Sequence, residues 1–447
     1  MPRHTLYATL LRIIRNKVAM RILRPLRGRS MALLWGGLSL SAIGDQLYAV
    51  ALTWIAVGVL GPNAGYLSAL QAFIGLLAVL FIGIWADRWE QLRSMIAADL
   101  VSAAVLLGVV AVALVSHGPG VMGLVCAIVV LALGQAVFRP ALQLVLPSVV
   151  ADTGLLPAAN GLLDATGRIA RLLGPGLVAL LVSALPVIHF LTLDAFTFLA
   201  SATALSLIRR RQPARPHPSG RIVPGSVWRG IVRGYRATSG HALLGYYLAV
   251  SGPLNGAWYA VFYLCLPLMI TSAGLGSSGG RAGLGSYGLV LAAYGCGNLA
   301  ATVFLGGRTL PARPQFQMLA GNIQCGCGIL LLAAANLLPA EWRLTGFAVA
   351  SVITAVGGPM QDIPTAVLRQ TRLAQADRPA AMRAYMAMVG LGILVAMLLI
   401  PTAITVFGMT RVIVGCGAVY LCVAAIGLAR FAGWREAQAV EPAAVTS

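Results

Sequence analysis

Long apolar runs follow one another along nearly the whole chain, separated by short polar or basic segments. A helix needs about 20 mostly apolar residues to cross about 30 Å of hydrocarbon, and each run supplies close to this length. The runs show no strict alternation of apolar and polar residues, which favours helices over a membrane barrel. They lie at residues 31–60, 64–86, 94–116, 120–139, 160–184, 187–208, 242–272, 282–306, 316–338, 342–367, 384–407 and 411–432. The pattern predicts an all-α membrane protein with twelve transmembrane helices.

The segments between the runs divide the chain. Residues 209–236 are rich in Arg, Pro and Gly, which is typical of a linker between two halves. Pro140 and Pro147 predict that the fourth helix ends near residue 139 and that residues 147–159 form a cytoplasmic link. We expect a basic cytoplasmic N-terminal segment (1–30), a first six-helix bundle (31–208), a cytoplasmic basic linker (209–241), a second six-helix bundle (242–433) and a cytoplasmic tail (434–447).

Short sequence matches relate the two predicted bundles. The triplet at 48–50, Tyr-Ala-Val, recurs at 259–261, and Pro-Ala-Ala at 157–159 recurs at 379–381. Such matches predict two parallel six-helix pseudo-repeats, with a substrate path at their interface.

Composition supports membrane insertion and fixes an expected orientation. The chain is 59% hydrophobic and 10% charged, with a mean hydropathy of +0.86, far from the range of soluble domains. With the spans above, only Arg281, Arg343 and Arg411 fall on one side, which leaves 29 of the 32 cations on the other. The positive-inside rule then places both termini in the cytoplasm. The net charge of +20 is therefore explained by the orientation of the chain in the membrane rather than by nucleic-acid binding. Residues 6–26 form either a basic amphipathic helix on the inner leaflet or a disordered tail.

Enzymatic and metal-binding signatures are absent from the sequence. All seven cysteines lie inside apolar runs, where they are expected to be small core residues without disulfides. No phosphate-binding loop, zinc-protease motif or nucleophile elbow occurs. We expect no enzyme activity, no metal and no cofactor, so that an ion gradient or the gradient of the substrate supplies the energy.

Acids inside the apolar runs are the strongest candidates for chemistry. Asp45 lies midway along the first span, where burial of a carboxylate is best explained by a water-filled cavity and reversible protonation. The alternative is an acid that only packs helices together through a hydroxyl or amide. Asp194 has no cation close in sequence, and Asp164 lies on a helical face with Asn160, Arg168 and Arg171. The candidates for proton coupling are therefore Asp45, Asp194 and Asp164.

Polar and aromatic side chains in the spans suggest where a substrate binds. The face of the fifth span that carries Arg168 either binds a polar substrate or holds the cytoplasmic ends of the halves together. Aromatic and amide residues of the seventh span suit an amphipathic ligand, although such residues more often serve packing. The substrate-cavity candidates are Gln46, Tyr48, Trp54, Arg168, Asn255, Trp258, Tyr259 and Tyr263.

A charged turn at 83–100, GIWADRWEQLRSMIAADL, lies between the second and third spans. Charges at a membrane edge need partners, which indicates a paired cluster; the alternative is a solvated loop that only sets orientation. This turn is similar to the signature loop of the major facilitator superfamily, in the Asp-Arg-x-Asp/Glu variant of its macrolide-efflux and enterobactin-exporter branch of drug:proton antiporters. The resemblance also involves Gly44-Asp45, the segments 97–100, 146–150 and 159–160, and Gly174-Pro175. It covers nearly the whole first half and fades in the second.

The resemblance implies an inner gate that opens and closes during alternating access. Gly83 would allow close approach of helices, and Asp87 would cap the eleventh helix. The gate residues that it implies are Gly83, Asp87, Arg88, Arg93, Asp99, Arg139 and Arg383. The sequence departs from the family at Gln91 and Leu92, where cations are usual, and at 178–179, where the antiporter motif has glycines.

Taken together, these features predict a secondary active exporter of an amphipathic small molecule, a drug-like compound or a siderophore, by proton antiport. The alternatives are an uncoupled facilitator or importer of the same fold, or a non-transporting membrane scaffold or sensor. We expect a monomer in the bacterial cytoplasmic membrane, in contact with the lipid bilayer and a small-molecule substrate and without a nucleic-acid partner.

Overall fold

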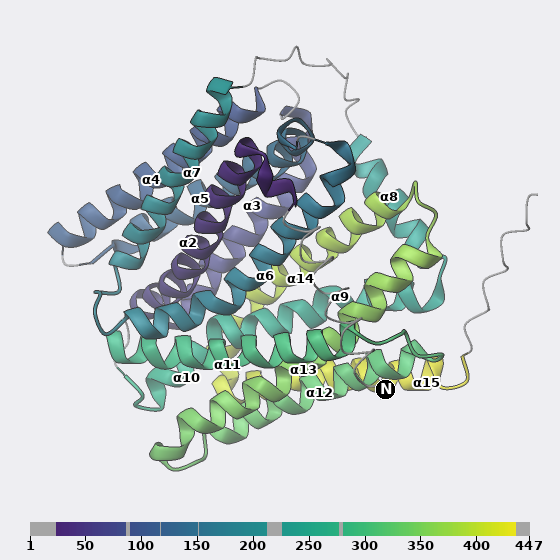
Figure 1. Ribbon diagram of the computed structural model, residues 1–447. Coiled ribbons are helices and arrows are strands. Elements are labelled where there is room, and N and C mark those ends of the chain that lie inside the picture. Colours follow the sequence, from purple (N-terminus) through teal and green to yellow (C-terminus); the bar gives the residue numbers. More distant parts are fainter. Residues whose placement is uncertain are drawn as a thin grey trace, which may run out of the picture. The chain divides into compact units, whose positions relative to one another are not determined.

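Helices form nearly all of the computed structural model, which describes residues 24–85, 90–116, 118–150, 152–211, 226–276 and 280–434 (Figure 1). No strand occurs within these ranges. The helices are α2 (Arg29–Leu60), α3 (Ala64–Trp85), α4 (Gln91–Val115), α5 (Gly120–Val149), α6 (Leu156–Leu181), α7 (His189–Arg211), α8 (Ser226–Ser239), α9 (Ala242–Ala260), α10 (Leu266–Ser272), α11 (Arg281–Gly306), α12 (Pro314–Ala335), α13 (Ala340–Arg372), α14 (Arg378–Phe407) and α15 (Met409–Phe431).

These helices confirm the predicted all-α membrane fold. Six of them, α2 to α7, precede the linker region, and six spans follow it when α9 and α10 are counted as one. Among the described residues, ten helical segments are long and apolar enough to cross a membrane. That number is lower than twelve because α2 runs into α3 through the 3₁₀ turn Gly61–Asn63, and because the more polar α6 is not among the ten.

The predicted end of the fourth helix is wrong. Helix α5 continues to Val149 through both Pro140 and Pro147. A proline removes one backbone N–H, but in an apolar environment the remaining backbone groups have no better partner than their own helix. Val145 and Leu146, which follow Pro140, are buried, so their packing also stabilises the continued helix. The link to α6 is therefore shorter than the sequence indicated.

A π-helical turn, Val261–Cys265, joins α9 to α10 within the seventh span. Pro267 stands at the start of α10 and has no N–H to donate to the carbonyl of Tyr263, four residues earlier. A wider turn accommodates this lost hydrogen bond. The turn immediately follows the aromatic residues Trp258 and Tyr259.

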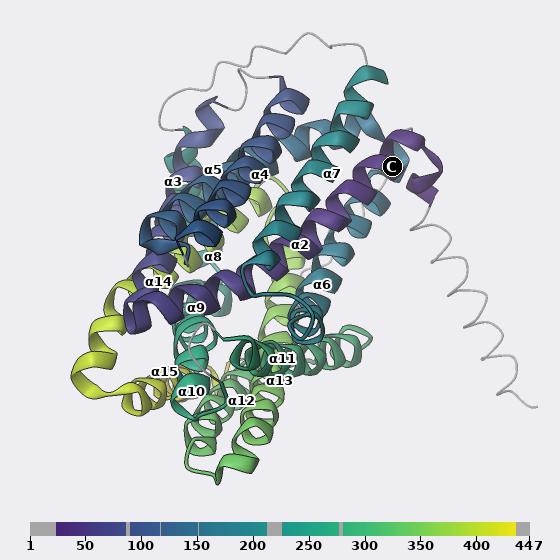
Figure 2. The same cartoon turned by 90° about the vertical axis from the view of Figure 1, so that its left-hand side faces the viewer.

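The chain forms two compact units, and each is described by itself. The first contains α2 to α7 together with residues 262–292 and 397–401, and the second contains residues 229–261, 293–396 and the chain from 402. In the first unit, α2 packs against α6 and α7, and α4 packs against α5 and α7 (Figures 1 and 2). In the second unit, α12 packs against α13 and α15, and α9 packs against α15.

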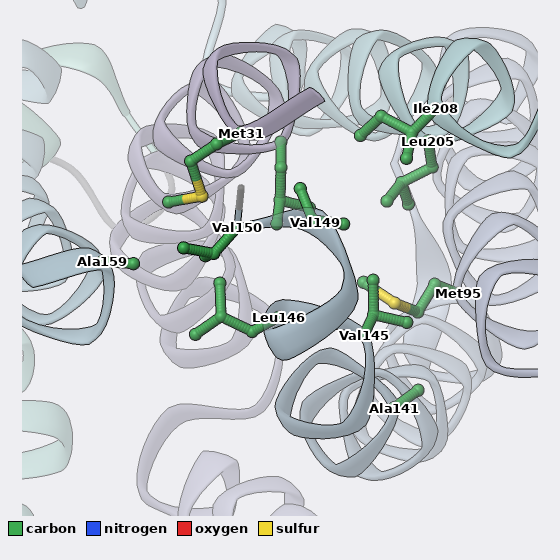
Figure 3. Packing of buried hydrophobic residues seen from close by; sticks show 11 residues of the cluster. Met31, Met95, Ala141, Val145, Leu146, Val149, Val150, Ala159, Leu205 and Ile208 are labelled. Carbon is green, nitrogen blue, oxygen red and sulfur yellow. The ribbon is translucent and has the colours of Figure 1, made fainter. Parts of the chain in front are cut away.

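A hydrophobic cluster closes one end of the first unit, where α2 and α4 begin and α5 and α7 end (Figure 3). Met31 of α2 and Met95 of α4 are fully buried there, and Ile208 of α7 packs with them. Val145 and Val149 reach this cluster from the part of α5 that lies beyond Pro140. Leu92 and Ile96, in the first turns of α4, also pack against this cluster.

Helix α8 occupies the second part of the expected basic linker. Within the second unit it lies against the start of α14, where Arg233 forms an ion pair of 2.7 Å with Asp377. The closest approach is at Gly234, where an added Cβ would overlap the backbone of Ala380. At Gly230 an added Cβ would meet only the guanidinium of Arg383, at 3.1 Å. The linker is thus docked by a Gly-x-x-x-Gly face that admits a neighbouring backbone.

These two glycines provide a matched test of the docking. Both Gly234→Ala and Gly230→Ala should stabilise the helix by about 1 kcal/mol through helix propensity. The difference in stability between the two variants therefore depends on packing alone. We expect Gly234→Ala to lower the melting temperature of the purified protein, because the backbone of Ala380 cannot move aside as a side chain can. Gly230→Ala should leave the melting temperature unchanged or raise it. Equal effects of the two variants would contradict the docking of α8.

Candidate functional site

Acidic side chains surround a cavity of about 260 Å³ inside the first unit. Asp45 reaches it from α2, Asp99 from α4 and Arg139 from α5. Ser41, Ser102 and Gln135 add polar groups, and Phe138 and Phe198 form part of the apolar lining. The cavity therefore combines ionisable groups with walls of low polarity.

Two of the acids are removed from solvent almost completely. Asp99 is 3% exposed and bonds to the hydroxyl of Ser201, and Asp194 of α7 is fully buried. Thr197 donates its hydroxyl to Asp194 Oδ1 at 3.0 Å. Asp194 can lie this deep because Gly44 of α2 packs directly against its carboxylate and against Thr197.

Each of the three acids keeps one carboxylate oxygen without a hydrogen-bond partner among the described residues. These atoms are Asp45 Oδ1, Asp99 Oδ2 and Asp194 Oδ2, and all three are buried. A buried oxygen without a partner costs about 1–3 kcal/mol, and more if it is charged. Asp194 also interacts electrostatically with both Asp45 and Asp99. The arrangement leaves capacity to bind a proton or a cationic group.

One guanidinium lines the cavity together with Asp45 and Asp99. Arg139 lines the cavity and interacts electrostatically with Asp45, while its side chain donates to Gln135 Oε1 at 3.3 Å. A single cation cannot balance three ionised carboxylates, and the uncompensated charge would lie in a medium of low polarity. Across the described ranges, no group of three His, Cys, Asp or Glu side chains is arranged to hold a metal ion.

The charged turn before α4 forms a second cluster, centred on Glu90. Its carboxylate accepts from Arg209 Nε at 2.7 Å and also pairs with Arg93. The predicted gate residue Arg93 therefore has a partner, but that partner was not among the predicted residues. Glu90 occupies the last position of the Asp-Arg-x-Glu motif, and this position was the signal that could have identified it.

Other predicted gate residues are distributed differently. Gly83 lies in the last turns of α3, and Asp87 and Arg88 lie outside the described residues. Asp99 lies six residues beyond Arg93 in α4, about 9 Å along the helix, and lines the acidic cavity. Arg383 belongs to the second unit and lies beside Gly230 of α8.

The polar face of α6 differs from the acidic cavity. Asp164 and Arg168 form an ion pair of 2.9 Å within the helix, and both side chains are more than half exposed. Asn160 donates to the carbonyl of Leu156 in the same helix. Asp164 is therefore locally neutralised, unlike the three buried acids.

The substrate-cavity candidates of α2 lie mostly within the packed interior. Trp54 is fully buried, donates its indole N–H to the carbonyl of Gly280 at 3.1 Å, and stacks on Tyr287 with ring centroids 6.1 Å apart. Tyr48 is buried, and Gln46 packs against Gly174 of α6. Trp54 is positioned to hold α2 against the first turns of α11.

Candidates from the seventh span fall in both units. In the second unit, Asn255 donates to the carbonyl of Ser251 at 2.9 Å and bonds to Tyr385 of α14, and Trp258 packs on Tyr294 with centroids 5.7 Å apart. Tyr259 is half-buried.

Two tyrosines, Tyr263 and Tyr385, interact with arginine side chains. Tyr263, in the first unit, interacts electrostatically with Arg171 of α6. In the second unit, the guanidinium of Arg369 lies 4.5 Å from the ring centroid of Tyr385. Tyr385 and Ser201 were not predicted, because nothing in their local sequence distinguishes them from packing residues.

Comparisons with known proteins identify the family and the fold. The family model of the Major Facilitator Superfamily matches residues 34–325. The chain is 29% identical over 217 residues to the multidrug efflux pump Tap of Mycobacterium tuberculosis (strain ATCC 25618 / H37Rv), which covers 47% of this chain and 51% of that protein. It is also 29% identical over 220 residues to the multidrug efflux pump Tap of Mycolicibacterium fortuitum, covering 47% and 52%. The chain thus spans about half the length of these curated relatives.

Solved structures resemble the chain over most of its length. An auto-inhibited peptide transporter of the POT family matches with a TM-score of 0.65 and 13% identity, covering 93% of this chain and 99% of that one. The nucleoside transporter NupG matches with a TM-score of 0.64 and 13% identity, covering 89% and 100%. At this level of identity the likeness concerns the fold alone.

The Glu90 cluster can be tested by a double-mutant cycle. Glu90 and Arg209 are each about one-third exposed, and partly exposed ion pairs contribute about 0.2–1 kcal/mol. We expect Glu90→Gln and Arg209→Gln to show a coupling energy within this range for unfolding in mixed SDS and detergent micelles. The more exposed pair of Asp164 and Arg168 is the control and should show a smaller coupling. A Glu90–Arg209 coupling no larger than that of the control would mean that Glu90 does not join α4 to α7.

Proposed function

The chain belongs to the Major Facilitator Superfamily, and we propose that it is a secondary active exporter that moves an amphipathic small molecule outward in exchange for protons. The acidic cavity of the first unit carries this proposal, because Asp45 and Asp99 line it together with a single arginine, and Asp194 interacts electrostatically with both acids. Export is further supported by the curated relatives, which are named multidrug efflux pumps. They favour a drug-like cargo over a siderophore.

Competition for negative charge explains how such a site exchanges protons for cargo. Protons that bind the carboxylates remove the uncompensated charge, and a cationic group near the cavity would remove it as well. Binding of one therefore weakens binding of the other, and this reciprocal coupling is the thermodynamic basis of antiport. Arg139 competes with protons and with a cationic cargo for Asp45, because its guanidinium interacts with that carboxylate whenever the carboxylate is ionised.

Aromatic and amide groups of α9, in the second unit, are proposed separately as cargo contacts. Trp258 and Tyr259 are partly exposed on a helix whose other side chains are largely buried, and Asn255 lies one turn before them. Aromatic faces with a few polar groups suit ligands that combine a flat apolar body with a polar end. The adjacent π-helical turn offers a place where the helix can change its winding during the cycle.

The distribution of charge supports the cytoplasmic membrane as the location, with both termini in the cytoplasm. Arg229, Arg233 and Arg236 of α8 are exposed, as expected for a helix on the cytoplasmic side. We propose a monomeric transporter without a cofactor, driven by the proton gradient and embedded in lipid.

Transport by the reconstituted protein tests the proposal. In proteoliposomes, a pH gradient should drive ethidium or rhodamine 6G, two lipophilic cations, against their concentration gradient. Asp45→Asn should slow this flux by at least about tenfold, equivalent to about 1.4 kcal/mol, because the neutral amide cannot exchange a proton. Asp164→Asn is the matched control and should keep most of the flux, since Asp164 is exposed and paired with Arg168.

Two outcomes would contradict this function. If both probes move only down their own gradients, with or without a pH gradient, the protein is an uncoupled facilitator. If Asp45→Asn and Asp164→Asn both transport like the wild type, Asp45 does not carry the coupled proton.

A further inference from the structure

A groove of about 630 Å³ runs along the outer side of α4 and α5 in the first unit. Glu90 and Arg93 lie at one end, and the walls beyond them are formed by small and apolar side chains, including Ala97. Val101 and Leu133 line the groove and are 52% and 49% exposed. Exposed apolar side chains on a membrane-spanning helix face hydrocarbon, so the groove opens toward the lipid.

The groove and the acidic cavity share a wall. Ala98 of α4 and Gly134 of α5 line both spaces. A Cβ added at Gly134 would lie 3.0 Å from Ser102 Oγ and 4.0 Å from the Cβ of Ala98. The wall between the groove and the cavity that contains Asp45 and Asp99 is therefore formed at this point by small residues, Ala98 and Gly134, with Ser102 beside them.

We propose that this groove is the access site through which an amphipathic organic cation passes from the membrane to the acidic cavity. This inference rests on the proposed export function and names the substrate class of the same site. The step that admits the cation is a separation of α4 and α5 at Ala98 and Gly134.

The apolar walls are compatible with the apolar body of such a ligand. An amphipathic cation partitions into the bilayer, and in the groove its apolar body exchanges contact with lipid chains for van der Waals contact with Val101, Leu133 and their neighbours. At the mouth, Glu90 is paired with Arg93 and Arg209, so its charge is already compensated. The groove itself therefore contributes mainly apolar contact.

The acids behind the wall supply the preference for a cation. Asp45 and Asp99 line the cavity with Arg139 as its one basic side chain among the described residues, and Asp194 interacts electrostatically with both acids. An unscreened negative charge of this kind acts over several ångströms in a medium of low polarity. A neutral amphiphile would gain the apolar contact but not the electrostatic attraction. A phospholipid is the competing occupant, with its phosphate at Arg93 and an acyl chain along the groove.

Filling the groove from the lipid side tests the access site with little risk to the fold. Leu133→Trp adds a large side chain at a position that is already exposed. Leu114→Trp is the matched control, because Leu114 is 60% exposed on α4 and does not line the groove. We expect Leu133→Trp to raise the half-saturating concentration for transport of rhodamine 6G by about fivefold with little change in maximal rate. Leu114→Trp should transport like the wild type, and all three proteins should have similar melting temperatures.

Binding in nanodiscs separates a failure of this inference from a failure of the export function. Leu133→Trp should weaken equilibrium binding of rhodamine 6G, followed by fluorescence anisotropy, by about the same fivefold. Unchanged binding and transport in Leu133→Trp would overturn the access site and leave export intact. Absence of wild-type transport would overturn the export function, and the binding result would then show whether the groove holds a cation. If Leu133→Trp loses bound phospholipid in native mass spectrometry while rhodamine 6G binding is unchanged, the groove is a lipid site and the inference is wrong.

A second variant tests the shared wall. Gly134→Val would place a branched side chain against Ser102 and Ala98, and it should lower the maximal transport rate more than the binding affinity for rhodamine 6G. Gly108→Val is its control, because a Cβ at Gly108 meets nothing within 4 Å. Equal maximal rates for the two variants, at equal melting temperatures, would exclude a passage between α4 and α5.

Discussion

Burial of negative charge in an apolar bundle is the constraint on which the first unit depends. Asp99 and Asp194 are almost completely removed from solvent and interact electrostatically with each other and with Asp45. One cation, Arg139, lines the cavity with Asp45 and Asp99. Such an arrangement is unfavourable for stability unless protons or a ligand compensate the charge. A helix bundle selected only for stability would be expected to replace these acids by apolar residues. Their presence is most simply explained by a cycle in which charge is added and removed.

Small residues make this burial sterically feasible. Gly44 lets α7 bring Asp194 against α2, and Gly134 lets α5 approach Ser102 of α4. Close backbone approach gives van der Waals contact where the hydrophobic effect gives little, since lipid is as apolar as a leucine side chain. Gly134, together with Ala98, also forms the wall that the acidic cavity shares with the lipid-facing groove. Close packing and the proposed access from the membrane thus depend on the same small residue, Gly134.

The helices were largely predictable from the sequence, and most of the contacts between them were not. Apolar runs of span length specify helices in a membrane because the backbone has no other partner, which is why twelve spans could be predicted. For the same reason α5 does not end at Pro140. The partner of Arg93 depends on where the end of α7 brings Arg209 relative to Glu90, and the position of Asp99 depends on which face of α4 meets α7. Neither relation can be derived from the spacing of residues along the chain. A polar residue within a span therefore identifies a candidate functional side chain but not the residue that it contacts.

Comparison of Asp164 with Asp45 shows what local pattern can and cannot decide. Both acids lie in spans with polar neighbours, and both were reasonable candidates for proton exchange. Asp164 has Arg168 four residues later, so its charge is balanced within its own helix. Asp45 has no cation at that spacing and meets Arg139 only through tertiary packing. A cation on a separate helix can be moved away when helices shift, whereas a partner on the same helix cannot. Only the first arrangement connects the charge state of an acid to the movement of helices, and that connection is what alternating access requires.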